Sequence, residues 1–413
     1  MDKGKRQLLI LILGLLSAIG PFSIDMYLPG FPTIANDLHT TVDQVSYSLS
    51  SFFIGICVGQ MICGPLLDRF GRKRPLYVGL VIYIIASLGC AVANSVELLI
   101  GFRFLQAIGG CVGMVAPGAI VRDSFPVKEN AKIFSLLILI LGVSPIIAPT
   151  VGSYLIAALG WHSVFILLAL ITAVLLIAVI FFLPESKQPD PSMSLKPQPI
   201  INGFLFVLKQ PQFFTYAFAG ATAAAGLFAY LAGSPFVFMK IYNVSEQQYG
   251  WIFGLIAAGL ITCSQLNNVL LRKYDSAQII RAVLLVQTTV GIILFFGSMF
   301  GFVNLYGTIF LIFLFLSCQG FSFPNSSALS LAPFTKEAGT ASALMGALQM
   351  GFGAVASAVV GLISNGTTLP MTGVMAGCAF LGLIILSIGR KRIYYKSRIE
   401  DVEAQAFEQI EKY

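Results

Sequence analysis

Two charged side chains stand inside long apolar stretches of this sequence, where an unpaired charge is costly. Asp25 lies near the end of the first stretch, between Pro21 and Pro29, and Arg103 lies in the fourth stretch, with Gln106 one helical turn later. Burial and nearby charge set the proton affinity of a carboxyl group. Asp25 could therefore bind and release a proton, with Arg103 as the neighbouring charge, and we expect the two side chains to meet.

A permanent ion pair between Asp25 and Arg103, which would only fix helix packing, is the alternative. Such a pair is a weak source of stability, because desolvation of both charges offsets their attraction. We therefore favour proton exchange at Asp25, with Gln106 on the same helix face as Arg103.

A third group of charges lies between the second and third apolar stretches. Five charged residues fall within residues 68–74, in a chain where 10% of residues are charged. Asp68 and Arg72 are four residues apart, so they can bond each other, or Arg72 can bond Asp123 at the end of the fourth stretch. Gly71 permits a tight turn between them. Alternatively, these residues form no specific cluster and only contribute to the excess of positive charge at one membrane face.

The elements that must position these residues are membrane-spanning helices. The chain has 413 residues, 57% of them hydrophobic, and its mean hydropathy is +0.87. About 20 apolar residues are enough to cross a bilayer as a helix, whereas a barrel would need short alternating strands. We therefore predict an all-α integral membrane protein. The predicted spans are 8–28, 45–65, 76–95, 98–120, 132–155, 162–183, 211–232, 247–270, 280–300, 304–329, 338–363 and 370–389.

The distribution of Lys and Arg predicts the orientation of these spans. With the amino terminus inside, 23 of the 25 Lys and Arg residues fall in cytoplasmic segments, Lys240 falls outside and Arg103 lies within a span. Loops that remain in the cytoplasm carry this excess of positive charge. We expect both termini to be cytoplasmic. The net charge of +7 is then explained by short loops and does not indicate a nucleic-acid partner.

Cysteine and histidine give no sign of a disulfide or a metal site. All seven cysteines lie in apolar stretches without a Cys-x-x-Cys pair, and the two histidines, His39 and His162, lie in predicted outer loops. We expect no cofactor, and the proton as the coupling ion. A membrane enzyme or a receptor is disfavoured, because no constellation of His, Cys and Asp is present and no large extramembrane segment exists.

The proline-rich segment 184–209 divides the chain into two six-span halves. Its five prolines predict a stiff, partly extended cytoplasmic linker. A weak internal repeat, 125–131 and 333–339, precedes the fifth and eleventh spans and supports this division. Transporters built from two such repeats hold their site near the membrane midplane. The predicted domains are a bundle at 1–183, the linker at 184–209, a bundle at 210–390 and a cytoplasmic tail at 391–413.

The segment between the second and third spans resembles the loop-2/3 signature of the major facilitator superfamily. Gly64, Asp68, Gly71 and Arg72 stand at matching positions, and the chain resembles the superfamily over its whole length. The resemblance implies a fold of twelve transmembrane helices in two six-helix bundles. It also implies that the charge cluster latches the outward-open state, with Asp123 as a further partner.

The fifth span resembles the antiporter motif of the same superfamily. Gly142, Pro145, Pro149 and Gly152 match it, while Ala148 and Ser153 stand where the motif has glycines. Small residues and prolines give a bendable helix that packs closely against the other half. Plain helix packing is the alternative for this motif.

Three segments together are similar to the Bcr/CflA group of drug:proton antiporters, which includes exporters of bicyclomycin and chloramphenicol. They are 23–29, 103–107, which begins with the superfamily's Arg-x-x-Gln motif, and 121–123. The similarity implies proton-coupled efflux of drugs or other toxic small molecules across a bacterial inner membrane. We expect a monomer in the lipid bilayer.

Aromatic and amide residues are candidates for a substrate pocket: Tyr27, Tyr230, Phe236 and Gln265. One acid facing neutral groups and aromatic rings suits lipophilic, neutral or weakly cationic compounds. A proton-coupled symporter that imports a small nutrient is the alternative. Sugar importers of this architecture usually carry more embedded acids, and this sequence shows one.

Overall fold

The structure is a computed structural model that describes residues 3–190, 197–334 and 337–410. Every regular element in these residues is helical, and twelve candidate membrane spans are found among them. The elements are α1 (Lys3–Asp25), η1 (Leu28–Gly30), α2 (Phe31–Asp37), α3 (Val42–Arg69), α4 (Lys73–Ala91), α5 (Val96–Ser124), α6 (Val127–Leu159), α7 (His162–Phe182), α8 (Pro197–Leu208), α9 (Pro211–Pro235), η2 (Phe236–Ile241), α10 (Glu246–Leu270), α11 (Ser276–Met299), α12 (Leu305–Leu331), α13 (Ala338–Leu362) and α14 (Leu369–Ile410). The predicted all-α membrane fold with twelve spans is confirmed.

Polar residues define where several spans begin. Thr41, Ser95, Ser245 and Asn304 precede α3, α5, α10 and α12, and each side chain accepts a hydrogen bond from the backbone N–H three residues later. Such caps satisfy backbone donors that have no partner within the helix. The helix starts therefore follow from local sequence, and the apolar runs behind them supply the length.

The first span is longer than predicted. α1 ends at Asp25, and η1 and α2 continue the helical path, so that the apolar segment runs from Arg6 to Asp37. Pro29 fits the first turn of η1, where its missing N–H has no helical partner to lose. This break in the helix places Asp25 at a helix end, close to the middle of the extended span.

The linker between the halves is more helical than predicted. Residues 197–208 form α8, whose Phe204 and Val207 pack against Phe334 and Leu344 near α13. Residues 191–196 of the predicted linker lie outside the described residues, as do 411–413 of the predicted tail. α14 continues without a break to Ile410, because the sequence between 390 and 410 contains neither Gly nor Pro. The predicted boundary at 390 is therefore not marked by a change in secondary structure.

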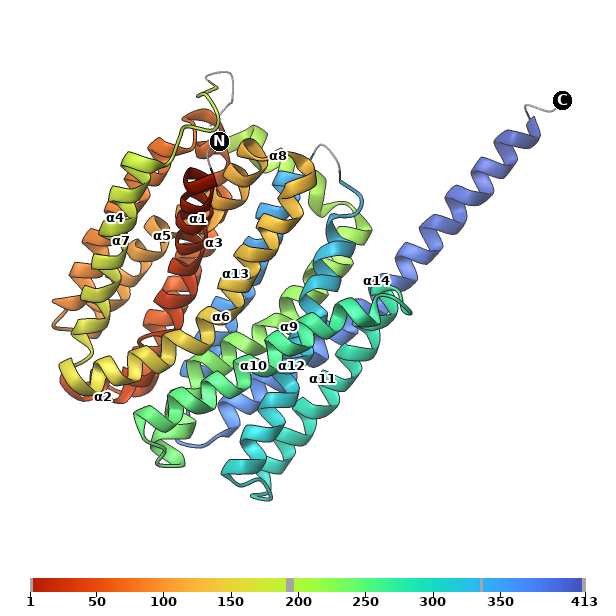
Figure 1. The fold of residues 1–413 in the computed structure, drawn as a ribbon. Helices are drawn as coiled ribbons and strands as arrows, with labels where there is room; N and C mark the ends of the chain where they lie inside the picture. The colour runs from red at the N-terminus through yellow and green to blue at the C-terminus, as the bar shows by residue number, and fades with distance from the viewer. Residues whose placement is uncertain (1–2, 191–196, 335–336, 411–413) are drawn as a thin grey trace.

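The spans form two groups that lie side by side (Figure 1). α1 and α3–α7 pack among themselves, as do α9–α14, and the groups meet mainly where α3 packs on α13 and α6 packs on α10. Figure 1 shows the amino terminus and α8 at one end of the molecule and α2 at the other. We call the end with Arg72, Lys209 and Arg272 the basic end, and the end with α2 the opposite end.

Side-chain hydrogen bonds join the two groups toward the opposite end. The Thr33 hydroxyl donates to the Glu246 carboxylate (2.8 Å), and the Ser50 and Ser357 hydroxyls are 2.7 Å apart. An added Cβ at Gly361 would lie 2.8 Å from the Tyr47 ring, so α13 and α3 are also in close contact there. In this conformation the halves are held together at the opposite end.

Candidate functional site

Arg103 lies in the core of the first six spans, on α5, with none of its surface exposed. Its guanidinium donates to the amide oxygen of Gln106 (2.5 Å) and to the backbone carbonyl of Ser23 on α1 (2.9 Å). The rings of Tyr27 and Phe52 cover it, with centroids 4.4 and 4.1 Å from Cζ. Within the described part of the chain, its Nε has no hydrogen-bond partner. Neutral acceptors and cation–π contacts thus surround this charge.

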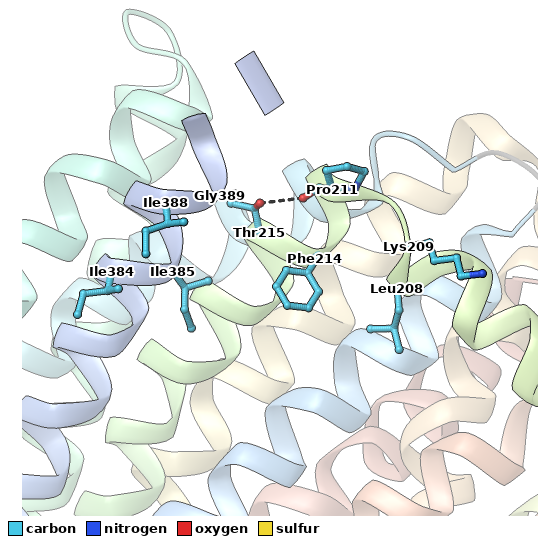
Figure 2. A pocket seen from close by; sticks show the side chains of 9 residues that line it. All are labelled: Leu208, Lys209, Pro211, Phe214, Thr215, Ile384, Ile385, Ile388 and Gly389. Carbon is cyan, nitrogen blue, oxygen red and sulfur yellow. Dashed lines mark hydrogen bonds between the residues drawn. The ribbon is translucent and has the colours of Figure 1, made fainter. Parts of the chain in front are cut away.

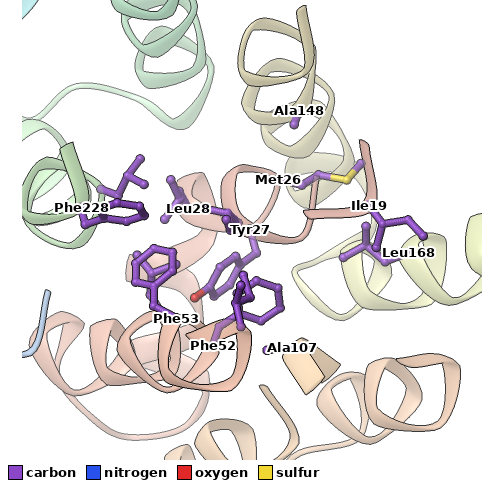
Figure 3. Packing of buried hydrophobic residues seen from close by; sticks show 14 of the residues in the cluster. Ile19, Met26, Tyr27, Leu28, Phe52, Phe53, Ala107, Ala148, Leu168 and Phe228 are labelled. Atoms are coloured by element: carbon purple, nitrogen blue, oxygen red, sulfur yellow. The ribbon is translucent and has the colours of Figure 1, made fainter. Parts of the chain in front are cut away.

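The groups around Arg103 are themselves held in place. The Tyr27 hydroxyl lies 3.1 Å from that of Ser48 on α3, and the Gln106 amide donates to Ser87 on α4 (2.7 Å). Figure 3 shows Tyr27 projecting from the end of α1 toward Phe52 on α3. Tyr27, predicted for the substrate pocket, is instead part of the wall around Arg103 here.

Asp25 does not pair with Arg103, contrary to the expectation that they meet. Ser23 directs its hydroxyl to Tyr83 on α4, 2.5 Å away. Asp25 comes two residues later, and each residue turns a helix by about 100°, so its side chain faces away from α4 and α5. Asp25 is 5% exposed as a residue, and its carboxylate makes no ion pair or side-chain hydrogen bond among the described residues.

Asp25 instead lines a small cavity at the junction of the two halves. The cavity has a volume of about 130 Å³, and side chains of α1, α6, α9, α10 and α12 surround it. Its lining includes Asp25, Gly142, Pro145, Tyr230, Phe253 and Leu316. The Tyr230 hydroxyl is buried and has no hydrogen-bond partner among the described residues. An acid from one half and a tyrosine from the other thus line one apolar space.

The antiporter-type motif of α6 contributes to this cavity and to the packing of α1. Gly142 and Pro145 line the cavity, whereas Gly152 lies two turns further along α6. An added Cβ at Gly152 would lie 2.8 Å from the carbonyl carbon of Met26, the residue after Asp25. Pro149 presents its carbonyl oxygen to Gly250 of α10, 3.3 Å from the position of an added Cβ. α6 therefore packs closely both on the end of α1 and on α10.

Two other predicted pocket residues lie away from this cavity. Phe236 begins η2, beyond the end of α9, and the Gln265 side chain is exposed one turn beyond Ile261 on α10. Phe253 and Leu316, which do line the cavity, were not predicted. They are apolar residues in apolar helices, so no feature of the sequence distinguishes them from core residues.

The charge cluster at the basic end assembles as predicted from Asp68, Arg72 and Asp123. Arg72 donates through Nη1 to Asp68 (3.1 Å) and through Nε to Asp123 (2.7 Å). Burial opposes the charge of Arg72, but the hydrogen bonds and charges of Asp123 and Asp68 outweigh burial and raise its pKa above the ordinary value. Gly71 has φ +79°, the left-handed conformation that favours glycine. Apart from its own helix, no described residue lies within 4 Å of an added Cβ at Gly64.

Residues that follow α7 complete the cluster, and sequence reasoning missed them. Glu185 accepts from the backbone N–H groups of Arg72 (2.7 Å) and Lys73 (3.2 Å), and Lys187 donates to Asp68 (2.7 Å). The charges of Glu185 and Lys187, directly after the sixth predicted span, are the sequence feature that could have identified these partners. The partners of the cluster thus come from the first six spans and from the start of the linker. Among the described residues, no group of three or more His, Cys, Asp or Glu side chains could hold a metal ion.

Comparison with known proteins agrees with this architecture. The model of the family described as Major Facilitator Superfamily matches residues 13–358. Two solved structures share the fold: a bacterial homolog of the lysosomal transporter Spinster (TM-score 0.71, 15% identity, 96% of this chain and 98% of that one) and the nucleoside transporter NupG (TM-score 0.72, 15% identity, 94% and 99%).

Several curated relatives match nearly full length. The chain is 30% identical over 375 residues to a bicyclomycin resistance protein homolog of Haemophilus influenzae, covering 91% of this chain and 94% of the relative. It is 32% identical over 397 residues to the uncharacterised transporter YdgK of Bacillus subtilis (94% and 98%), and 28% identical over 373 residues to the multidrug resistance protein MdtL of Escherichia coli (89% and 91%). The chain is a multi-pass membrane protein of the major facilitator superfamily, as its loop motif predicted, with bicyclomycin and multidrug resistance proteins among its relatives.

Proposed function

We propose that this transporter exports small lipophilic compounds from the cell in exchange for protons. The observation that carries the proposal is the unpaired Asp25 carboxylate in an apolar cavity between the two halves. A charge buried without a partner is costly, so the site favours either a proton or a cationic group of the substrate on Asp25. Competition between the two for one carboxylate, with the site open to each side in turn, would couple substrate export to proton entry.

The cavity as seen here belongs to one conformation of the proposed transport cycle. A volume of about 130 Å³ lies below the roughly 300–1,000 Å³ of drug-sized pockets. A drug-like molecule would therefore bind in a state in which the halves have moved apart around Asp25 and Tyr230. The ring of Phe253 and the hydroxyl of Tyr230 supply the apolar and polar contacts that a lipophilic substrate needs.

Arg103 has a supporting part in this proposal. Its guanidinium, held by Gln106 and by the Ser23 carbonyl, anchors the last turns of α1 to α5. A movement of α1 that follows protonation of Asp25 would have to rearrange these contacts. We therefore assign proton exchange to Asp25 and the positioning of α1 to Arg103 and Gln106.

The charge cluster is proposed to control which end of the transporter opens. Asp68, Arg72 and Asp123 tie the α3–α4 turn to α5, and Lys187 and Glu185 tie it to the linker that leads to the second half. In this conformation the halves are joined at the opposite end. The cluster is therefore assembled in a conformation in which the halves are joined at the end proposed to face outward, and we propose that its rearrangement acts on the second half through the linker.

Export is favoured over import by the relatives whose names record drug resistance. We further propose that the basic end faces the cytoplasm of a bacterial inner membrane and that the transporter acts as a monomer. Positive charge in the connections at that end supports this orientation.

Drug susceptibility and proton flux test the proposed function together. Expression in an efflux-deficient bacterium should raise resistance to lipophilic compounds, and purified protein in vesicles should release protons when substrate is added on the cytoplasmic side. Asp25→Asn should abolish both effects at normal membrane expression. Uptake of a nutrient down a proton gradient, without resistance to any compound, would favour the symporter.

A further inference from the structure

A second cavity lies away from the half–half junction. It has a volume of about 410 Å³ and is a groove between the start of α9 and the last apolar turns of α14. Figure 2 shows Ile384, Ile385 and Ile388 of α14 on one side, Leu208 and Lys209 on the other, and Phe214 between them. Lys209 is the charged residue in this apolar lining.

The groove lies where the apolar part of the second half ends. Lys209 precedes the first residue of α9, and the apolar run of α14 stops at Gly389, directly before Arg390 and Lys391. Lys391 follows Ile388 by three residues, so the two lie on one helix face. Both lysines are exposed. An apolar groove with cations at its rim therefore opens at the level where lipid headgroups meet hydrocarbon.

α8 extends the same apolar surface. Phe204 and Val207 are buried against the second half, whereas Ile201 and Leu205 are 47% and 48% exposed. Leu205 and Leu208 are three residues apart on this helix, so the exposed face of α8 leads into the groove. A short helix with an apolar face and a basic residue at its end has the pattern of a helix that lies in the membrane interface.

We propose that the groove binds one anionic phospholipid. An acyl chain lies between Phe214 and the isoleucines of α14, and the phosphate contacts Lys209 and Lys391. A lysine near the membrane surface attracts an anionic lipid with about 1 kcal/mol, or about five-fold in affinity. The lipid would connect the linker helix α8 to α14, and it thereby gives the linker a lipid-dependent anchor on the second half.

A zwitterionic lipid fits the same apolar walls but offers no net charge to the two lysines. The substrate site is separate, because its acid lies on α1 at the junction of the halves. Charge complementarity at the rim therefore selects the anionic lipid as the occupant. The inference depends on the membrane-spanning fold and holds whether or not the transporter exports drugs.

Native mass spectrometry of the purified full-length protein tests the site. Phosphatidylglycerol and phosphatidylcholine with identical acyl chains would be titrated separately. We expect one phosphatidylglycerol to bind preferentially, with affinity reduced about five-fold in Lys209→Gln and further in Lys209→Gln/Lys391→Gln. Lys273→Gln is the matched control, because Lys273 is an exposed lysine at the same end but outside the groove.

A second variant tests the apolar part of the groove. Ile388→Trp places a larger ring where the acyl chain should lie, so it should weaken the binding of the preferred phosphatidylglycerol without removing a charge. Equal affinities of the unmodified protein, Lys209→Gln and Lys273→Gln for phosphatidylglycerol would overturn the proposal. So would the absence of any difference between the two lipids. Neither readout measures transport, so failure of this inference is distinguishable from failure of the proposed function.

Discussion

Gly152 offers a direct test of the close contact between α6 and the end of α1. In Gly152→Ala the new methyl group would lie 2.8 Å from the carbonyl carbon of Met26 and closer still to its oxygen. Both are backbone atoms, so no side-chain rotation can relieve the overlap. At Gly142, on the same helix, an added Cβ meets nothing nearer than Ile261 at 3.7 Å, which is an ordinary contact. Gly142→Ala is therefore the matched control.

The expected magnitude follows from these two environments. Overpacking of a close contact costs about 1–3 kcal/mol, whereas Gly→Ala in an unhindered helix interior gains about 0.5–1 kcal/mol. We expect Gly152→Ala to be destabilised by about 1–2 kcal/mol on balance and Gly142→Ala to be as stable as the unmodified protein or slightly more stable. Because Met26 follows Asp25 directly, displacement of η1 also moves the carboxylate. Transport by Gly152→Ala should fall by about tenfold or more.

Stability and transport can be measured separately, and the two tryptophans report on stability. Trp161 is buried beyond the end of α6, and its indole donates to Asp37 (2.9 Å), whereas Trp251 is exposed on α10. Thermal melts in detergent, read from Trp fluorescence, give the stability, and efflux of a fluorescent lipophilic cation gives transport. Identical melting temperatures for Gly152→Ala and Gly142→Ala would refute the contact between α6 and Met26.

Further variants test the remaining parts of the site. In everted vesicles, Asp25→Glu should retain part of the proton-coupled export, whereas Asp25→Asn should lose it. Equal export by the two variants would contradict the assignment of proton exchange to Asp25. Tyr230→Phe should leave the melting temperature unchanged or raise it, because the substitution removes a buried hydroxyl that has no hydrogen-bond partner among the described residues. Its profile of exported compounds should change, and an unchanged profile would count against contact with substrate. Glu185→Gln should lose about 0.5–1 kcal/mol in detergent melts, because Glu185 is exposed and an amide oxygen replaces the charged acceptor of two backbone N–H groups, and a wild-type melt would contradict this. A cysteine at Asn243 should react with an impermeant maleimide added to intact cells, and protection there would reverse the proposed orientation.

The membrane fold could be predicted from the sequence because span length, apolar composition and loop charge are local properties. The cluster of Asp68, Arg72 and Asp123 could also be predicted, since i,i+4 spacing and a glycine turn bring its members together. The contributions of Glu185 and Lys187 could not. They depend on how the chain leaves α7, and a proline-rich segment gives no periodic pattern from which that path could be read.

The position of Asp25 depends on one quantity that the sequence does not supply, the rotation of α1 about its own axis. Arg103 was correctly predicted as a buried charge, but its partners are a backbone carbonyl, an amide and two aromatic rings. None of these is distinctive in a chain with 57% hydrophobic residues. Charge alone suggested that Asp25 would be the partner, and neutral groups satisfied the guanidinium instead.

The separation of Asp25 from Arg103 changes what a double-mutant cycle should show. Had the two formed a buried ion pair, removal of either charge would strand the other, and the two effects on stability would be coupled by more than about 1 kcal/mol. Here Arg103 keeps its contacts to Gln106 and Ser23 when Asp25→Asn removes the acid. We therefore expect the effects of Asp25→Asn and Arg103→Gln on the melting free energy to add within about 0.5 kcal/mol. Arg103→Gln should be the strongly destabilised variant, because it leaves the Gln106 amide and the Ser23 carbonyl without their donor. Coupling well above 0.5 kcal/mol, or restored export in the double variant, would show that the two charges act as a pair in another state of the cycle.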